Sequence, residues 1–173
     1  AVYVHQQVMK QIAVGQSEMF VSDLFTSIRT QRGATQPYMS IVCFGENGSY
    51  LHYSPSSLKQ AQSGELVLID NGCAVNGYAS DITRTYPISG KFTAKQADLY
   101  NIVLAAQNEA FSKIKPGVNW VNVHIAAEKT LLKGLVEKGL VTGDVEDLWT
   151  KRVIYYFMPH GIGHYIGLYT HDL

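Results

Sequence analysis

The stretch from Leu66 to Pro87, LVLIDNGCAVNGYASDITRTYP, constrains the fold more than any other part of this chain. Its first five residues form an apolar run typical of a buried strand, and the run ends in the carboxylate of Asp70. The segment GCAVNGYAS has the character of a hairpin, so we expect the chain to return and bring Asp81 beside Asp70. Two adjacent carboxylates repel, and a cation between them would relieve that cost. In the alternative interpretation, Asp70 caps a turn and Asp81 pairs with Arg84.

A second cluster of possible ligands lies in the run FMPHGIGHYIGLYTHD, which holds His160, His164 and His171. The glycines between the first two histidines argue against a regular helix and would allow the backbone to approach a ligand closely. Imidazole combined with carboxylates suits Mn, Co, Fe or Zn. In the competing interpretation, His164 is a loop histidine bonded to backbone, and His171 forms a surface pair with Asp172.

The remaining histidines carry a weaker signal. His52, in the segment LHYS, stands at an expected strand end and can be read either way. His5 and His124 lie in helical patterns, and we interpret both as structural or exposed.

Composition narrows the function classes. The 173 residues carry a net charge of zero and are 46% hydrophobic, which describes a folded domain without the basic surface typical of nucleic-acid binding. No apolar run has the length of a membrane span. Two cysteines, Cys43 and Cys73, do not make a disulfide framework, so we expect a reducing compartment, the cytoplasm. The chain carries no nucleophile elbow, P-loop or dinucleotide-binding glycine motif.

The pattern of elements predicts an α+β fold with an antiparallel sheet. Thr93 and Gln96 form the sequence signature of a capping box in front of a long helix. Within the second predicted helix, the apolar stripe is Met19, Phe20, Leu24, Phe25 and Ile28. The expected helices are 2–13, about 19–32, 94–113, 120–138 and 145–153. The expected strands are 39–44, 51–53, 66–70 and 83–86.

These residues together resemble the pita-bread metallopeptidases, in particular the prolidase and aminopeptidase P branch. The similarity is carried by LIDNGCAVNGYASDITRTYPISGKFTAKQADLY, by FMPHGIGHYIGLYTHD and by LHY at 51–53, and it covers nearly the whole chain. Methionine aminopeptidases share the paired aspartates but lack the SDITRTYP…GKFT continuation. The resemblance implies the creatinase/aminopeptidase fold, with residues 1–173 as the N-terminal half and the start of the C-terminal half of the catalytic domain.

The resemblance also implies roles for individual residues. Asp70 and His164 would each bind one of two metal ions, and Asp81 would bridge both. His52 and His171 would contact the substrate or stabilise the reacting carbonyl, and His160 would lie beside the metals as a further catalytic histidine. Tyr38 matches a tyrosine near the substrate. The implied reaction is hydrolysis of an Xaa-Pro bond, as a dipeptidase or an aminopeptidase, with two divalent cations, most often Mn²⁺ and alternatively Co²⁺ or Zn²⁺.

The family site has five protein ligands, and the two glutamates among them lie C-terminal to the histidine motif. We therefore expect a partial catalytic domain whose activity needs a further C-terminal segment, and a family N-terminal domain outside this chain. A homodimer is implied by the resemblance alone. Two alternatives remain: a non-catalytic pita-bread module that binds peptides or proteins, or an inactive truncated product. A creatinase-like hydrolase without metals is disfavoured by the aspartate of SDIT.

Overall fold

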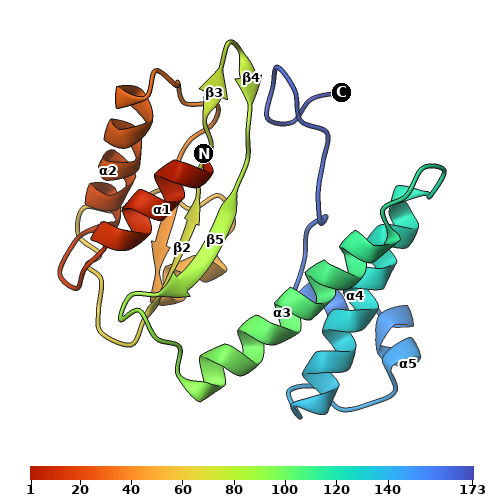
Figure 1. The fold of residues 1–173 in the computed structure, drawn as a ribbon. Helices are drawn as coiled ribbons and strands as arrows, with labels where there is room; N and C mark the ends of the chain where they lie inside the picture. The colour runs from red at the N-terminus through yellow and green to blue at the C-terminus, as the bar shows by residue number, and fades with distance from the viewer. The chain divides into compact units, whose positions relative to one another are not determined.

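The computed structural model describes residues 1–173, which divide into two compact units. The first unit comprises residues 1–92 and 164–173, and the second comprises residues 93–163. Figure 1 labels the helices and strands of both units.

The first unit is built on a three-stranded antiparallel sheet with the strand order β1-β2-β5. The strands are β1 (Ile41–Phe44), β2 (Leu66–Asp70) and β5 (Thr83–Pro87). The register pairs Asp70 with Ile41 on one side and with Thr83 on the other. The carboxylate of Asp70 thus stands at the last rung of both ladders, at the end of the apolar strand where the sequence predicted it.

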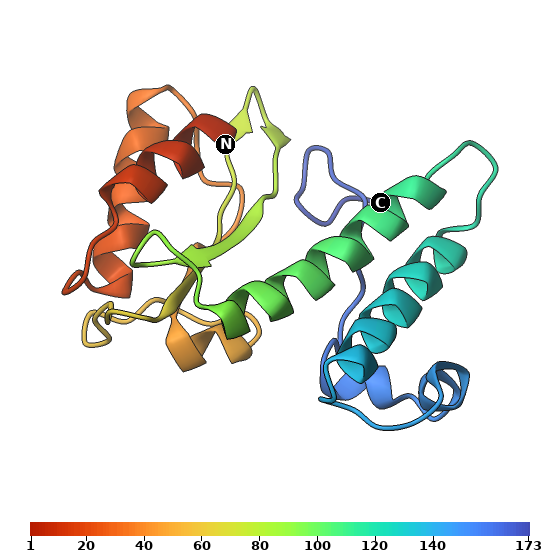
Figure 2. The ribbon, with the colours of Figure 1, turned by 60° about the horizontal axis from the view of Figure 1, so that its bottom comes forward.

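Two helices, α1 (Val2–Gln11) and α2 (Glu18–Gln31), lie on the same side of this sheet, as Figure 2 shows. Val8 and Phe25 are fully buried against Val42, Val67 and Ile69 of the sheet. Helices and sheet together form one continuous apolar core. A residue that is fully buried in this way contributes about 1.5–3 kcal/mol relative to exposure.

The predicted apolar stripe of α2 was partly wrong. Met19 and Phe20 are 40% and 49% exposed, while Phe25 is fully buried. The buried face of the helix includes Glu18 and Arg29. These two charged residues find hydrogen-bond partners inside the unit, so they tolerate burial, and a search for apolar periodicity alone does not find them.

The short hairpin between the two aspartates consists of β3 (Ala74–Val75) and β4 (Tyr78–Ala79). Asn76 and Gly77 both have positive φ, at 51° and 85°, as a two-residue type I′ turn requires. The C-terminal segment lies beside this hairpin in Figure 1, where the Ala79 amide donates to the Gly167 carbonyl at 2.8 Å.

The predicted strand at 51–53 does not form. Instead, β1 leads into a short 3₁₀ helix, η1 (Gly45–Ser49), and an irregular loop follows. His52 has φ of 53°, in the left-handed region, which a strand residue cannot adopt. The local conformation therefore excludes the strand despite the apolar and aromatic residues on both sides of His52.

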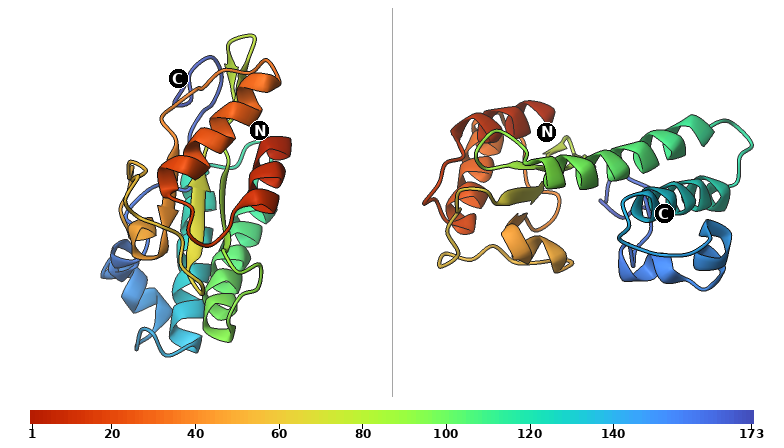
Figure 3. Two further views of the ribbon diagram at one scale, coloured as in Figure 1. Left: turned by 90° about the vertical axis from the view of Figure 1, so that its left-hand side faces the viewer. Right: turned by 90° about the horizontal axis from the view of Figure 1, so that it is seen from below.

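The second unit is mainly an antiparallel pair of helices, α3 (Ala94–Lys113) and α4 (Trp120–Glu137), visible side by side in Figure 3. Both sides of the predicted capping box are present, since the Thr93 hydroxyl accepts from the Gln96 amide and the Gln96 side chain accepts from the Thr93 amide. The chain then forms α5 (Val145–Thr150), shorter than expected, and a 3₁₀ turn, η2 (Val153–Tyr156). Leu132 and Ile154 are central to the core of this unit.

None of the helices combines the length and the apolar character that crossing a membrane would require.

Candidate metal and substrate site

The two aspartates meet at one phenolic hydroxyl. Tyr38 Oη lies 2.7 Å from Asp70 Oδ1 and 2.8 Å from Asp81 Oδ1. The β3–β4 hairpin returns the chain to this point, and the return is tight at Gly72, where an added Cβ would overlap the Ser80 carbonyl oxygen. Arg84 donates to the Thr83 carbonyl instead of pairing with Asp81, so the alternative interpretation of Asp81 was wrong.

The electrostatics of this cluster favour a cation. Burial raises the pKa of Asp70, the charge of Asp81 raises it further, and hydrogen bonds from Tyr38 and Thr83 partly oppose this rise. Burial, followed by hydrogen bonding to Asp70 and Asp81, also raises the pKa of Tyr38. One hydroxyl carries one proton and cannot donate fully to two carboxylates, so its hydrogen bonds do not fully compensate the negative charge of Asp70 and Asp81. Such a pair of hard oxygen donors fits a divalent ion.

Two of the three motif histidines join this cluster. His164 Nε2 lies 3.1 Å from Asp81 Oδ2, and the His164 and His171 rings meet edge to face with centroids 4.3 Å apart. His164 Nδ1 faces the Tyr165 carbonyl at 2.7 Å. Asp172 accepts from the backbone amides of Leu168 and Leu173. His171 therefore faces the cluster through His164, and no side-chain pair with Asp172 forms.

A buried network of hydrogen bonds fixes the backbone directly after Asp70. Asn71 is fully buried, and its side chain accepts from Arg29 Nη1 at 2.9 Å and donates to the Ser40 hydroxyl at 2.7 Å. Arg29 also donates to the Gly72 carbonyl at 3.1 Å, and His5 Nε2 lies 3.0 Å from the Asn71 carbonyl. Hydrogen bonds to three other residues thus fix the two residues that follow Asp70. Sequence reasoning missed this network, although Arg29 lies one helical turn from Phe25 on the buried face of α2.

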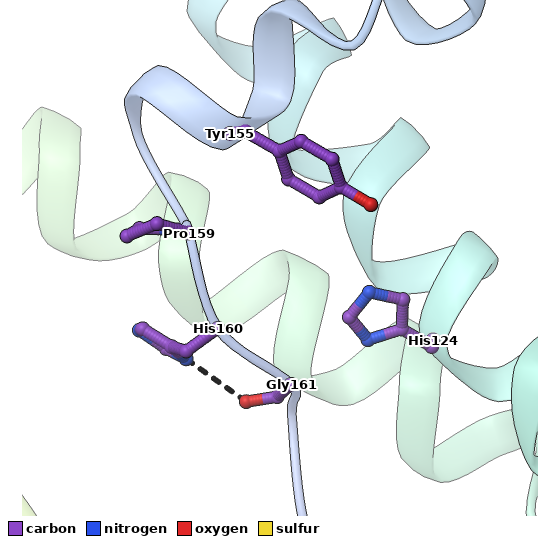
Figure 4. A pocket seen from close by; sticks show the side chains of 5 residues that line it. All are labelled: His124, Tyr155, Pro159, His160 and Gly161. Atoms are coloured by element: carbon purple, nitrogen blue, oxygen red, sulfur yellow. Dashed lines mark hydrogen bonds between the residues drawn. The ribbon is translucent and has the colours of Figure 1, made fainter.

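His52 and His160 lie outside this group of contacts. His52 is exposed on the loop after η1. His160 belongs to the second unit, where its Nδ1 faces the Gly161 carbonyl at 2.9 Å and it lines an open hollow of about 410 Å³ with His124, Tyr155 and Pro159. Figure 4 shows the His124 and Tyr155 rings on one side of the segment that carries Pro159 and His160.

The two histidines that the sequence assigned to helices, His5 and His124, each contact other side chains of their own unit. His5 is 4% exposed and packs edge to face on Phe25. His124 lies 3.1 Å from Glu128, a buried carboxylate that also accepts from Trp149 Nε1 at 2.7 Å.

Asp70 and Asp81 both contact the Tyr38 hydroxyl, and His164 contacts Asp81, but the three side chains do not form a closed ligand set. No group of three or more His, Cys, Asp or Glu side chains is arranged to hold a metal ion. The Tyr38 hydroxyl lies between the two carboxylates, so a metal would have to displace it from at least one of them. Carboxylate and imidazole donors are nevertheless the kinds of ligand that suit a divalent ion.

Comparisons with known proteins agree with this chemistry. The model of metallopeptidase family M24 matches residues 1–173. A probable Xaa-Pro aminopeptidase pepP of Pyrenophora teres f. teres is 43% identical over 169 residues, which are 97% of this chain and 36% of that protein. A probable Xaa-Pro aminopeptidase of Phaeosphaeria nodorum is 44% identical over the same shares of the two chains.

Solved structures agree as well. Aminopeptidase PepP of Pseudomonas aeruginosa matches with a TM-score of 0.95 and 36% identity, over 99% of this chain and 39% of that one. A zinc-substituted Escherichia coli aminopeptidase P in complex with product matches with a TM-score of 0.95 and 35% identity, over the same shares.

The fold is that of the pita-bread class of metallopeptidases, and the predicted α+β fold is confirmed by these neighbours. The chain belongs to metallopeptidase family M24. It spans between a third and two fifths of the length of the relatives named above.

Proposed function

We propose that the protein containing this chain hydrolyses the bond between an N-terminal residue and a following proline, as an Xaa-Pro aminopeptidase. The observation that carries the proposal is the meeting of Asp70 and Asp81 at the Tyr38 hydroxyl, with His164 against Asp81. The relatives are named Xaa-Pro aminopeptidases, which favours this activity over the dipeptidase activity.

Asp70, Asp81 and His164 would hold two divalent ions together with ligands from outside these 173 residues. Bound there, the ions would supply Lewis-acid chemistry, lowering the pKa of a water molecule and polarising the scissile carbonyl. Mn²⁺ is our proposal for the native ion, with Co²⁺ and Zn²⁺ as alternatives. The relative from Escherichia coli has been solved in a zinc-substituted form, so the three ions need direct comparison.

The other side chains of the site would act on the substrate. His52 and His171 would contact the substrate or stabilise the reacting carbonyl, and His160 would act as a further catalytic histidine. Tyr38 would bind on the substrate side of the aspartates. A peptide bond to proline has no N–H to donate, so recognition has to come from contacts with the carbonyl and the ring.

The test is Mn²⁺-dependent cleavage by the protein in the form in which the cell makes it, because this chain spans only part of the relatives' length. Equal concentrations of an Xaa-Pro-Xaa tripeptide, an Xaa-Pro dipeptide and an Xaa-Ala-Xaa tripeptide are compared. Release of the first residue from the Xaa-Pro-Xaa peptide alone supports the aminopeptidase. Cleavage of the dipeptide alone would mean a dipeptidase, and no cleavage with any metal would favour the non-catalytic peptide-binding module or the inactive product.

We also propose a cytoplasmic homodimer. Both Cys43 and Cys73 are buried free thiols, as a reducing compartment allows. Analytical ultracentrifugation of the purified protein tests the oligomeric state and would also detect a separate C-terminal fragment bound to this chain.

A further inference from the structure

The carboxylate of Glu18 is fully buried, and no Lys or Arg forms an ion pair with it. Glu18 is the first residue of α2, directly after the N-cap Ser17, so its charge lies at the positive end of the helix. A buried carboxylate without a cation is costly unless hydrogen bonds compensate it. The compensation in this structure comes from one short segment of the chain.

Four donors meet the two carboxylate oxygens. Oε1 accepts from the Phe44 amide at 2.8 Å and from Asn47 Nδ2 at 2.9 Å. Oε2 accepts from the Tyr53 hydroxyl at 2.8 Å and from the Ser56 amide at 3.0 Å. A carboxylate offers about four lone-pair sites, so the acceptor capacity of Glu18 is fully used.

All four donors lie between residues 44 and 56, and they flank His52. Asn47 Nδ2 also donates to the Tyr53 hydroxyl at 2.8 Å, which links the two halves of the loop. Burial, followed by the hydrogen bond to Glu18, raises the pKa of Tyr53 to about 12, so this hydroxyl keeps its proton as a donor. The Met19 amide donates to the Ser56 carbonyl at 3.1 Å, which ties the same loop to α2 once more.

His52 itself is held in a strained conformation. Its φ of 53° lies in the left-handed region, which is unfavourable for a residue with a Cβ. Such a conformation persists only where the surroundings impose it. The neighbouring residue Tyr53 is fixed by Glu18, and the ring of His52 is left exposed.

We propose that Glu18 is a positioning residue that fixes the 44–56 loop so that His52 is presented to the substrate. This inference rests on the proposed function, because it assigns His52 a contact with the peptide. A purely structural role would stabilise the fold without acting through His52, and the two roles can be separated by experiment.

The main variant is Glu18→Gln. One carboxylate oxygen becomes an NH₂ group that faces two donors, so two of the four hydrogen bonds are lost. Hydrogen exchange of the backbone amides between 44 and 56 should become at least about 10-fold faster, while amides of the β2–β5 ladder keep their protection. Tyr53→Phe, which removes one donor, should give a smaller change of the same kind. Glu137→Gln, an exposed carboxylate on α4, is the matched control and should change neither readout.

The kinetic readout is a double-mutant cycle with His52→Ala. Glu18→Gln should lower kcat/KM about 10-fold or more, with the same division between kcat and KM as His52→Ala, and it should have no further effect in the His52→Ala background. An additional loss of activity in the double variant would overturn the positioning role. A fall in kcat alone, in proportion to the fraction of Glu18→Gln that remains folded, would also overturn it. Unchanged hydrogen exchange in Glu18→Gln would overturn it without any activity assay. An inactive parent protein would instead refute the proposed function, and the exchange data would still decide whether Glu18 fixes the loop.

Discussion

His164 Nε2 lies 3.1 Å from Asp81 Oδ2, although 83 positions of sequence separate the two residues. The contact forms because the segment after Gly163 returns to the β3–β4 hairpin, where the Gly167 carbonyl accepts from the Ala79 amide. Two motifs that are far apart in the sequence thus contribute to one cluster of ionisable groups.

Asp81→Asn should abolish tight binding of Mn²⁺ by this cluster. The amide keeps the shape of the side chain but removes the charge that compensates the ion, and an amide nitrogen cannot act as a ligand. We expect a loss of affinity larger than the roughly 10–100-fold that outer-shell changes cost, measured by isothermal titration calorimetry at constant pH. Asp98→Asn is the matched control, since Asp98 pairs with Lys138 on an exposed helix surface. If both variants bind Mn²⁺ as tightly as the unmodified protein, Asp81 is not a ligand.

The buried histidine of α1 predicts a pH dependence of stability. Burial lowers the pKa of His5 below 6.5, and the positive charge of Arg84 lowers it further. Below about pH 6.5, His5 therefore binds a proton in the unfolded chain but stays neutral in the folded chain. The free energy of unfolding should fall as the pH drops toward the folded-state pKa. The slope due to this residue is at most about 1.4 kcal/mol per pH unit.

Urea denaturation at pH 7.5 and pH 5.0 measures this contribution. His5→Gln keeps a side-chain donor for the Asn71 carbonyl but cannot titrate, and it should show a smaller loss of stability between the two pH values. An equal loss in both proteins would assign the pH dependence to other groups.

The sequence predicted most elements but not the groups that fix the site. Thr93 and Gln96 determine the start of α3 locally, so the predicted helix 94–113 was confirmed at both ends. The predicted strand at 51–53 was wrong because His52 has a left-handed backbone, and the neighbouring Tyr53 donates to Glu18, which lies on a different element. The Tyr38 contact to both aspartates likewise depends on the fold of the hairpin. Charged residues on a buried helix face become interpretable only once their partners are known.

Asn71→Ala should destabilise the first unit by about 2 kcal/mol. The change removes the acceptor for Arg29 Nη1 and the donor to Ser40, and it leaves a buried guanidinium with fewer partners. Thermal unfolding followed by circular dichroism measures the effect. Asn101→Ala, at an exposed position of α3, is the control and should stay within about 0.5 kcal/mol of the unmodified protein. A cost for Asn71→Ala no larger than the control would mean that the network under Asp70 is not stabilising.

Gly134→Ala should destabilise the helix pair, although alanine favours a helix over glycine by about 1 kcal/mol. A Cβ at position 134 would meet Cγ2 of Ile102 at 2.5 Å, and Ile102 is only 8% exposed in the core between α3 and α4. Overpacking of this kind typically costs about 1–3 kcal/mol, so the net effect on the free energy of unfolding should be unfavourable. The double variant Ile102→Ala/Gly134→Ala provides the control, because removing both Cγ atoms of Ile102 opens the space for the new methyl group. The two changes should therefore be less than additive in denaturant unfolding. A rise in stability for Gly134→Ala alone would mean that α3 and α4 approach less closely at this point than the structure has them.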